Sequence, residues 1–355
     1  MTKRVADERK LKRAFEVQAD HCVKLEAPFN ARVCGLLPDI LDDTSALGRR
    51  VLGWSQDALG GDLVPLRCCA GFHALVRKNR VAALVEAYPP NTPDDAALSA
   101  ALRDAIAQED AYLADYLDSA PQTNEIGRSG VLLGGLFAIA QRLRKPIALF
   151  EIGASAGLNL QFDRWSFDLG DAGRWGPEDA RVKVRCNWTG DAPAMRETLD
   201  VVSRAASDLA PLDPAESDHR DRLLSYIWPD QTERLERTVA ALDLAAESGL
   251  KVEKADAIDW VAERMSANNA RPGTTTVLWH SVFIQYVEAP ARRTLIDAIR
   301  SRGEQATDDR PFAWLEMEQG HQNRAQCELR LTLWPGGETV KLADVDWHGR
   351  SAHWL

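Results

Sequence analysis

The stretch Ile147-Ala-Leu-Phe-Glu-Ile-Gly-Ala-Ser-Ala-Gly-Leu-Asn-Leu160 decides the fold class of this chain of 355 residues. It opens with four apolar residues, as a buried strand does, and Glu151 follows them. Small residues then alternate at Gly153, Ser155 and Gly157, before a segment that can start a helix. A buried strand entering a tight glycine turn brings backbone N–H groups and a helix N-terminus to one point, which suits an anionic ligand group. We therefore expect the functional site at this turn.

These residues match sequence motifs of two unrelated kinds of enzyme. Residues 151–157 resemble the acidic-x-Gly-x-Gly-x-Gly motif of class I S-adenosylmethionine-dependent methyltransferases, with Ser155 in place of the central glycine. In that family the glycine loop wraps the methionine end of the cofactor. Residues 153–157 also read as the Gly-x-Ser-x-Gly nucleophile elbow of a serine hydrolase. The first resemblance implies that the cofactor contacts Glu151, Gly153, Ala154, Ser155, Gly157 and Asn159.

The sequence around the turn favours the cofactor loop. A hydrolase sheet needs several strands before its elbow and an upstream oxyanion loop. Residues before 145 show almost no strand signal, and the pair Gly134-Gly135 lies inside a helical pattern. Glu151 suits the start of a methyltransferase motif better than a hydrolase core strand. A glycine turn that only packs a helix on a strand remains the plainest alternative.

Composition excludes several classes of partner. There are 53 acidic and 43 basic residues, and this acidity argues against broad binding to nucleic-acid phosphates. The charged start of the chain lacks a signal-peptide core, and no apolar segment is long enough for a membrane span. Six cysteines show no metal-ligand spacing, and no metal site is expected. We expect a cytoplasmic protein with reduced thiols and a small-molecule substrate; the sequence does not indicate an oligomeric state.

The pattern changes near residue 144. Residues 1–144 read as successive helices, and residues 145–355 alternate strand and helix, which predicts a mostly parallel sheet with helices on its faces. We expect an α/β fold of the Rossmann-like methyltransferase type, with a seven-stranded sheet that follows an all-helical N-terminal domain in the sequence. Strands are predicted at 147–150, 201–206, 251–254, 275–278, 312–316 and 329–333. Residues 164–192 interrupt the series and are predicted to form an antiparallel hairpin that serves as part of a lid.

Carboxylates follow the second and third predicted strands, at the sheet edge where ligands of open α/β sheets bind. Asp208 comes before Leu-Ala-Pro and resembles the methyltransferase acid that accepts hydrogen bonds from both ribose hydroxyls. A helix cap is the alternative for Asp208. Asp256, followed by Ala257, resembles the acid that meets the adenine amino group, whereas Asp259 reads as an early helix charge.

Polar residues also follow the fourth predicted strand. His280 and Ser281 stand where that strand would turn into the substrate cleft, and we assign both to the cofactor site. His280 can also act as a general base, with Tyr286 and Glu316 as the other catalytic candidates. The alternatives are a core histidine hydrogen-bonded to the backbone and, for Glu316, a solvated acid.

Several motifs together resemble a bacterial family known only as a domain of unknown function and regarded as methyltransferase-like. They lie at residues 124–136, in the glycine loop, and at 227–234, 280–286 and 347–349. The resemblance implies the fold more firmly than an activity. Arg128 stands before the first strand, where its guanidinium can pair with a cofactor carboxylate, or else with Glu125 in a surface salt bridge.

The expected function is methyl transfer from S-adenosylmethionine to a small molecule, which depends mainly on alignment of the reacting groups. Three alternatives stay open. The first is a serine esterase that uses Ser155, and the second, weaker, is a nicotinamide-dependent oxidoreductase. The third is a non-catalytic protein that binds a metabolite or a partner protein.

Overall fold

The computed structural model describes residues 2–55, 57–196, 198–266, 269–321 and 323–355. The chain forms two compact units. The first contains residues 1–123 and 217–236, and the second contains residues 124–216 and 237–355. The boundary predicted at residue 144 therefore differs from the one found, because the helix before the first strand belongs to the second unit. The chain also returns once to the first unit.

The first unit is helical throughout its described residues. Its helices are α1 (Thr2–Lys24), α2 (Pro28–Leu36), η1 (Leu37–Asp39), α3 (Ala46–Leu52), α4 (Val64–Arg77), α5 (Ala82–Ala87), α6 (Asp95–Tyr116), α8 (Ser217–Ser225) and the start of α9 (Thr232–Ser248). The returning segment completes this unit. Asp230 accepts hydrogen bonds from the backbone N–H groups of Phe29 and Asn30 at 2.8 and 3.1 Å, at the start of α2. Trp228 joins the apolar core.

The second unit is an α/β domain. Its helices are η2 (Ile126–Arg128), α7 (Ser129–Leu143), η3 (Leu158–Arg164), η4 (Gly170–Ala172), the rest of α9, α10 (Ala257–Arg264), η6 (Ile284–Tyr286) and α11 (Ala289–Glu304). Its strands are β1 (Ile147–Ile152), β2 (Ser166–Asp168), β3 (Arg174–Trp175), β4 (Lys183–Arg185), β5 (Asn187–Gly190), β6 (Val201–Asp208), β7 (Glu253–Lys254), β8 (Thr275–Ser281), β9 (Phe312–Gln319), β10 (Cys327–Trp334), β11 (Glu338–Val345) and β12 (Ser351–Trp354).

The main sheet of the described residues has nine strands in the order β5-β12-β11-β10-β9-β8-β1-β6-β7, where seven were predicted. The five strands from β7 to β9 run parallel. The strands β9 to β12 form an antiparallel meander, and β5 joins its outer edge. All six predicted strands are present. The extra strands are β5, β11 and β12, of which β5 and β12 are only four residues long and the first half of β11 is largely exposed.

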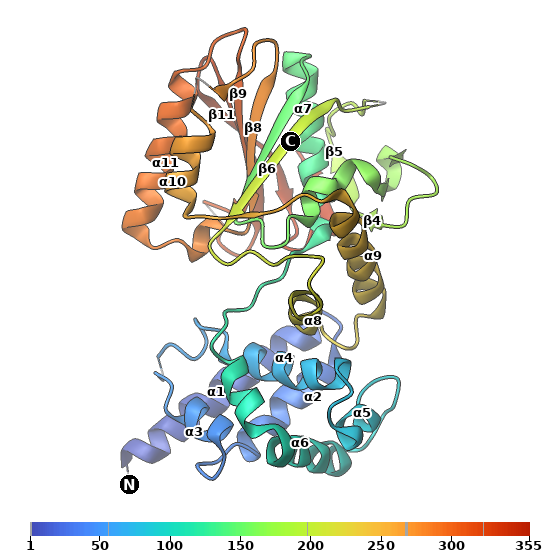
Figure 1. The fold of residues 1–355 in the computed structure, drawn as a ribbon, viewed down its shortest axis with the longest axis vertical. Helices are drawn as coiled ribbons and strands as arrows, with labels where there is room; N and C mark the ends of the chain where they lie inside the picture. Colours follow the sequence, from blue (N-terminus) through green and yellow to red (C-terminus); the bar gives the residue numbers. More distant parts are fainter. Residues whose placement is uncertain (1, 56, 197, 267–268, 322) are drawn as a thin grey trace. The chain divides into compact units, whose positions relative to one another are not determined.

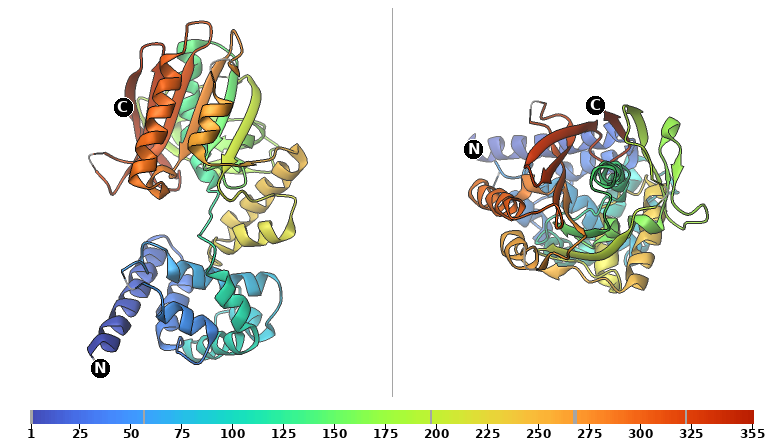
Figure 2. Two further views of the ribbon diagram at one scale, coloured as in Figure 1. Left: turned by 60° about the vertical axis from the view of Figure 1, so that its left-hand side comes forward. Right: turned by 90° about the horizontal axis from the view of Figure 1, so that it is seen from above.

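Alternate residues of the sheet face different helices. Ile152, Leu278 and Trp314 pack with α10 and α11 on one face, and these helices lie side by side in Figures 1 and 2. On the other face α7 approaches β9 closely, since a Cβ on Gly135 would lie 2.5 Å from the Leu315 side chain. Both faces of the parallel strands are thus covered.

The insertion at 164–192 differs from the predicted antiparallel hairpin. Strand β2 pairs with β4 in parallel, and β3 takes the antiparallel place beside β2. Strand β5 leaves this small sheet and joins β12 of the main sheet. Alternation of apolar and polar residues indicates which side of a strand is buried, but it does not specify the partner or its direction.

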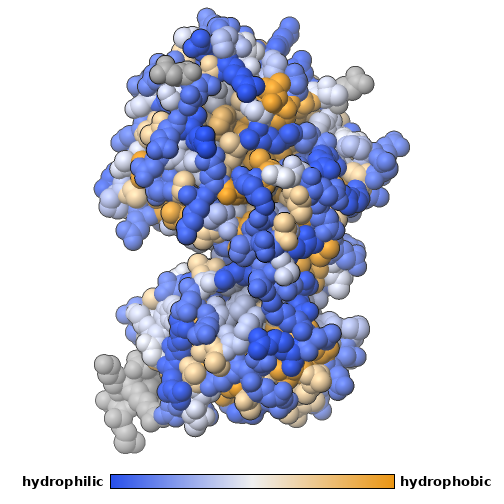
Figure 3. All heavy atoms as spheres, viewed as in Figure 1, coloured by the Kyte–Doolittle hydropathy of each residue, from blue (hydrophilic) through white to orange (hydrophobic). Residues whose placement is uncertain are grey.

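Hydrophilic residues cover most of the face of each unit shown in Figure 3, and apolar residues form small groups between them. Among the described residues, no helix combines the length and apolar character that crossing a membrane requires.

Candidate functional site at the carboxyl edge of the parallel strands

The turn after β1 is a strained loop at the carboxyl edge of the sheet. Gly153 and Gly157 have φ values of 66° and 68°, and Ser155 between them has a φ of 54°. This left-handed conformation costs a residue with a Cβ about 1–2 kcal/mol. A Cβ on Gly153 would lie 2.1 Å from the Phe283 ring, so glycine is also required there by contact. The chain continues into the 3₁₀ segment η3 rather than into a regular α-helix.

Asp208, at the end of β6, holds this loop. One of its carboxylate oxygens accepts a hydrogen bond from the Ser155 backbone N–H at 2.8 Å, and the other accepts from Ala210 at 2.9 Å. The backbone of the loop also bonds to Ser207 and Leu212. Asp208 is half-buried, and each carboxylate oxygen can accept a further hydrogen bond. The predicted ribose-binding acid therefore lies directly against the glycine loop.

Glu151 is a buried acid beneath the loop, 2% exposed. Burial raises its pKa to about 8, and the charge of Asp208 acts in the same direction. Its Oε2 atom has no hydrogen-bond partner among the described residues. Glu151 therefore carries a proton at neutral pH for much of the time, unlike an ordinary surface glutamate.

The segment before α7 packs against the end of the loop. The Leu158 backbone N–H donates to the Asn124 side chain at 2.9 Å, and the Asn159 side chain donates to the Glu125 carbonyl at 3.4 Å. The Glu125 carboxylate caps η2 by accepting from Gly127 at 3.0 Å. The same carboxylate oxygen lies 4.0 Å from the Arg237 guanidinium.

Arg128 joins three parts of the chain. Its guanidinium donates to the Trp347 carbonyl at 3.0 Å and to the Ser281 carbonyl at 3.2 Å. Burial lowers its pKa, and the nearby Glu125 opposes that shift. The turn at 347–349 lies so close that a Cβ on Gly127 would be 2.4 Å from the His348 carbonyl oxygen. The motifs at 124–136, 280–286 and 347–349 thus meet at this edge.

His280 is a core residue, fully buried. The Trp314 indole N–H donates to its Nε2 at 3.0 Å, so Nε2 carries no proton and Nδ1 does. Nδ1 donates to Glu318 at 2.7 Å. The same Glu318 oxygen accepts from the backbone N–H groups of Phe283 and Ile284 at 2.9 and 3.2 Å. His280 therefore braces the turn after β8, and neither ring nitrogen is free to take a proton from a substrate.

The other catalytic candidates differ in their surroundings, although Glu316 is the register partner of His280 on the neighbouring strand β9. Glu316 accepts from the Arg330 guanidinium at 2.8 Å inside the unit, which rules out the solvated acid considered for it. Tyr286 is 70% exposed. His280 and Glu316 are thus both engaged with other side chains, and Tyr286 is the exposed member of the three.

The remaining predicted cofactor contacts lie at the same edge as the loop. Asp256 caps α10 by accepting from the Ile258 N–H at 2.8 Å, and Ala257 is the first residue of that helix. The N–H of Ala255 donates to the Asp208 carbonyl, which brings the segment of Asp256 next to Asp208. Ser281 contributes its carbonyl to Arg128, as described above.

Buried polar atoms without hydrogen-bond partners in the described structure gather at the loop. They are Glu151 Oε2, Ser155 Oγ, Asn159 Oδ1 and Ser207 Oγ. Buried polar atoms are rarely left unpaired, so such a group indicates a bound molecule or ordered water. No group of three or more histidine, cysteine or acidic residues is placed to hold a metal ion within the described ranges.

Comparison with known proteins assigns the family. Residues 12–354 match a family described as an uncharacterized protein conserved in bacteria, DUF2332. The chain belongs to DUF2332. No curated protein and no solved structure matches it.

Three residues of this DUF2332 site were not predicted from the sequence. Phe283 covers Gly153, Asn124 accepts from the loop, and Trp314 donates to His280 Nε2 and so selects the tautomer of the ring. The first two lie inside the motifs at 280–286 and 124–136, which is the signal that could have indicated them. Trp314 lies on a buried strand, where the sequence predicts only that a tryptophan belongs to the apolar core.

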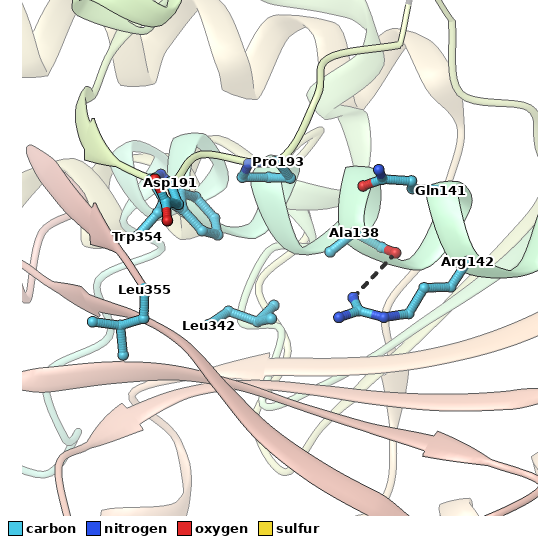
Figure 4. Close-up of a pocket in the computed structure, with 8 residues that line it drawn as sticks. All are labelled: Ala138, Gln141, Arg142, Asp191, Pro193, Leu342, Trp354 and Leu355. Atoms are coloured by element: carbon cyan, nitrogen blue, oxygen red, sulfur yellow. Dashed lines mark hydrogen bonds between the residues drawn. The ribbon is translucent and has the colours of Figure 1, made fainter.

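A separate pocket of about 340 Å³ in the DUF2332 chain lies where α7 faces the last strand (Figure 4). Gln141, Arg142, Asp191 and Trp354 are among its lining residues. Arg142 donates to the Ala138 carbonyl of its own helix at 3.5 Å. None of the predicted site residues lines this pocket, so the candidate site remains at the glycine loop.

Proposed function

We propose that this protein is an S-adenosylmethionine-dependent methyltransferase that acts on a small molecule. The observation that carries the proposal is the position of the glycine loop. Strand β1 lies between β6 and β8, and the chain builds outward to β6 and β7 before it returns to β8. Ligands of open α/β sheets bind at such a reversal, outside the carboxyl ends of the strands.

The side chains around the loop suit this cofactor. Asp208 supplies acceptors for ribose hydroxyls, and Asp256 stands at the next strand end for the adenine amino group. The unpartnered oxygen of Asn159 is an acceptor for the ammonium of the methionine moiety, and Glu151 is a second acceptor in its ionised form. Arg128 is the cation for its carboxylate. When bound, the cofactor supplies an electrophilic methyl group on a sulfonium.

The surroundings of His280 limit how the acceptor is activated. Because both of its ring nitrogens are engaged, we propose that catalysis uses alignment of the acceptor with the methyl group rather than a histidine base. This favours an acceptor that is already nucleophilic at neutral pH. The exposed side chain of Tyr286, at the end of the turn after β8, is available to contact that acceptor.

A panel of ligands tests the class of cofactor. We expect S-adenosylmethionine and S-adenosylhomocysteine to raise the melting temperature of the full chain, and NADH to leave it unchanged. In Asp208→Ala the shift with both adenosyl ligands should disappear, whereas Asp259→Ala, an exposed acid of α10, should keep it. Stabilisation by NADH alone would support the oxidoreductase alternative, and stabilisation by none of the ligands would contradict the proposal.

The strained backbone of Ser155, within its Gly-x-Ser-x-Gly sequence, favours a serine esterase, since a nucleophile elbow is also strained. However, an elbow exposes its hydroxyl, and Ser155 Oγ is buried without a histidine partner in the described structure. We therefore expect no labelling by a fluorophosphonate probe. Labelling that Ser155→Ala abolishes would establish the esterase instead.

A further inference from the structure

A second pocket, of about 340 Å³, lies on the sheet face that carries α10 and α11. Ala148 and Thr276 line it, and each is the second residue of its strand, β1 or β8. The glycine loop follows the opposite end of β1. The pocket is therefore separate from the candidate cofactor site.

Arg302 of α11 is the unusual residue of this pocket. It is 5% exposed, and its Nε and Nη1 atoms have no hydrogen-bond partner in the described structure. Its guanidinium lies over the Phe312 ring, 5.0 Å from the centroid. A ring face compensates only part of what a guanidinium loses when it leaves water. Within the part of the chain that the structure describes, this buried cation therefore has no counter-ion.

The other charged groups of the pocket do not supply that counter-ion. Glu253 is the one acidic residue among those that line the pocket, and its carboxylate pairs with Arg264 at 2.6 Å. Arg271 adds a third guanidinium at the exposed rim. Residues 267 and 268, outside the described ranges, are alanine and asparagine and carry no charge. The lining of the pocket therefore contains three arginines and one glutamate.

We propose that this pocket binds a small organic oxyanion, a phosphate or a carboxylate, with its anionic group on Arg302. A guanidinium donates two parallel hydrogen bonds to either group. Ser203, Thr276 and Asn269 provide further polar contacts, and Phe150 provides an apolar wall for the rest of the ligand. The proposal does not depend on the methyltransferase function, because no residue of the glycine loop takes part.

Titration calorimetry with three probes tests this site at constant ionic strength in sodium chloride. The probes are inorganic phosphate, phenyl phosphate and benzoate. We expect the full chain to bind at least one of them, and phenyl phosphate or benzoate to bind more tightly than inorganic phosphate because of the apolar wall. The preference between phenyl phosphate and benzoate then identifies the anionic group.

Three variants test whether the binding takes place in this pocket. Arg302→Met should fold, since it replaces an uncompensated buried cation by an apolar chain, and should weaken binding by at least about tenfold. Arg271→Ser, at an exposed position, should weaken it to a smaller extent, and Arg300→Ser, exposed on the same helix, should not change it. Absence of binding by all three probes, or equal binding by the Arg302 and Arg300 variants, would overturn the proposal.

Discussion

At the scale of single residues, Ser155 is the clearest departure from a glycine loop. Its left-handed backbone is a conformation that glycine adopts without cost. We predict that Ser155→Gly raises the free energy of unfolding by up to about 1 kcal/mol, because relief of strain outweighs the greater freedom of the unfolded chain. Urea unfolding measures this change. Ser155→Ala keeps the Cβ and should show no gain; equal gains in both variants would show that the hydroxyl, not the backbone, carries the strain.

Glu151 makes stability depend on pH. Its pKa rises from 4.5 in the unfolded chain to about 8 in the folded protein, so the folded state holds the proton more tightly. Its contribution is fully present below about pH 4.5 and is lost as pH rises toward about 8, at about 1.4 kcal/mol per pH unit. We predict that Glu151→Gln removes this loss, as measured by urea unfolding at about pH 5 and about pH 8.

The exposed Glu338→Gln is the control for Glu151 and should follow the unmodified protein at both pH values. If the two substitutions gave the same pH dependence, the protonated state assigned to Glu151 would be wrong.

At the scale of elements, the close packing of α7 on the sheet requires glycine at the contact position. An added Cβ at Gly135 would lie 2.5 Å from Leu315, whereas one at Gly35 in α2 meets no atom within 4 Å. Gly135→Ala should therefore lower the free energy of unfolding by about 1–3 kcal/mol through overpacking. Gly35→Ala should raise it by about 0.5–1 kcal/mol, since alanine favours a helix. Calorimetric unfolding of both variants checks the contrast, and a stabilised Gly135→Ala would contradict the packing described for α7.

The sequence predicted the elements better than their connections. The run of residues 147–150 indicates a parallel strand because both of its faces are apolar. Strands β2 to β5 are two to four residues long, and such short segments do not indicate their partners. The acids at the strand ends could be predicted as site residues, because in an open α/β sheet the topology alone places a strand end such as Asp208 beside the loop. The role of His280 depends on Trp314 and Glu318, which lie on another strand and leave no local signal.

At the scale of the whole molecule, the helical unit is built from two separate parts of the chain. His73 bonds to the Ser225 carbonyl at 3.1 Å, and Asp230 caps α2. We predict that a fragment of residues 1–144 lacks a cooperative urea transition by circular dichroism. A fragment that joins residues 1–123 to 217–236 through a flexible linker should show one. Cooperative unfolding of the first fragment would show that the returning segment is dispensable.

We propose above all that the loop after β1 and Asp208 together hold S-adenosylmethionine. The most direct measurement is titration calorimetry of S-adenosylhomocysteine into the unmodified protein, Asp208→Asn and Ser155→Gly. The Asp208→Asn side chain keeps an oxygen for the Ser155 N–H but loses the charge and one acceptor. We predict binding by the unmodified protein, affinity about ten- to a hundredfold lower in Asp208→Asn, and equal or higher affinity in Ser155→Gly. No binding by the unmodified protein, or unchanged affinity in Asp208→Asn, would contradict the account.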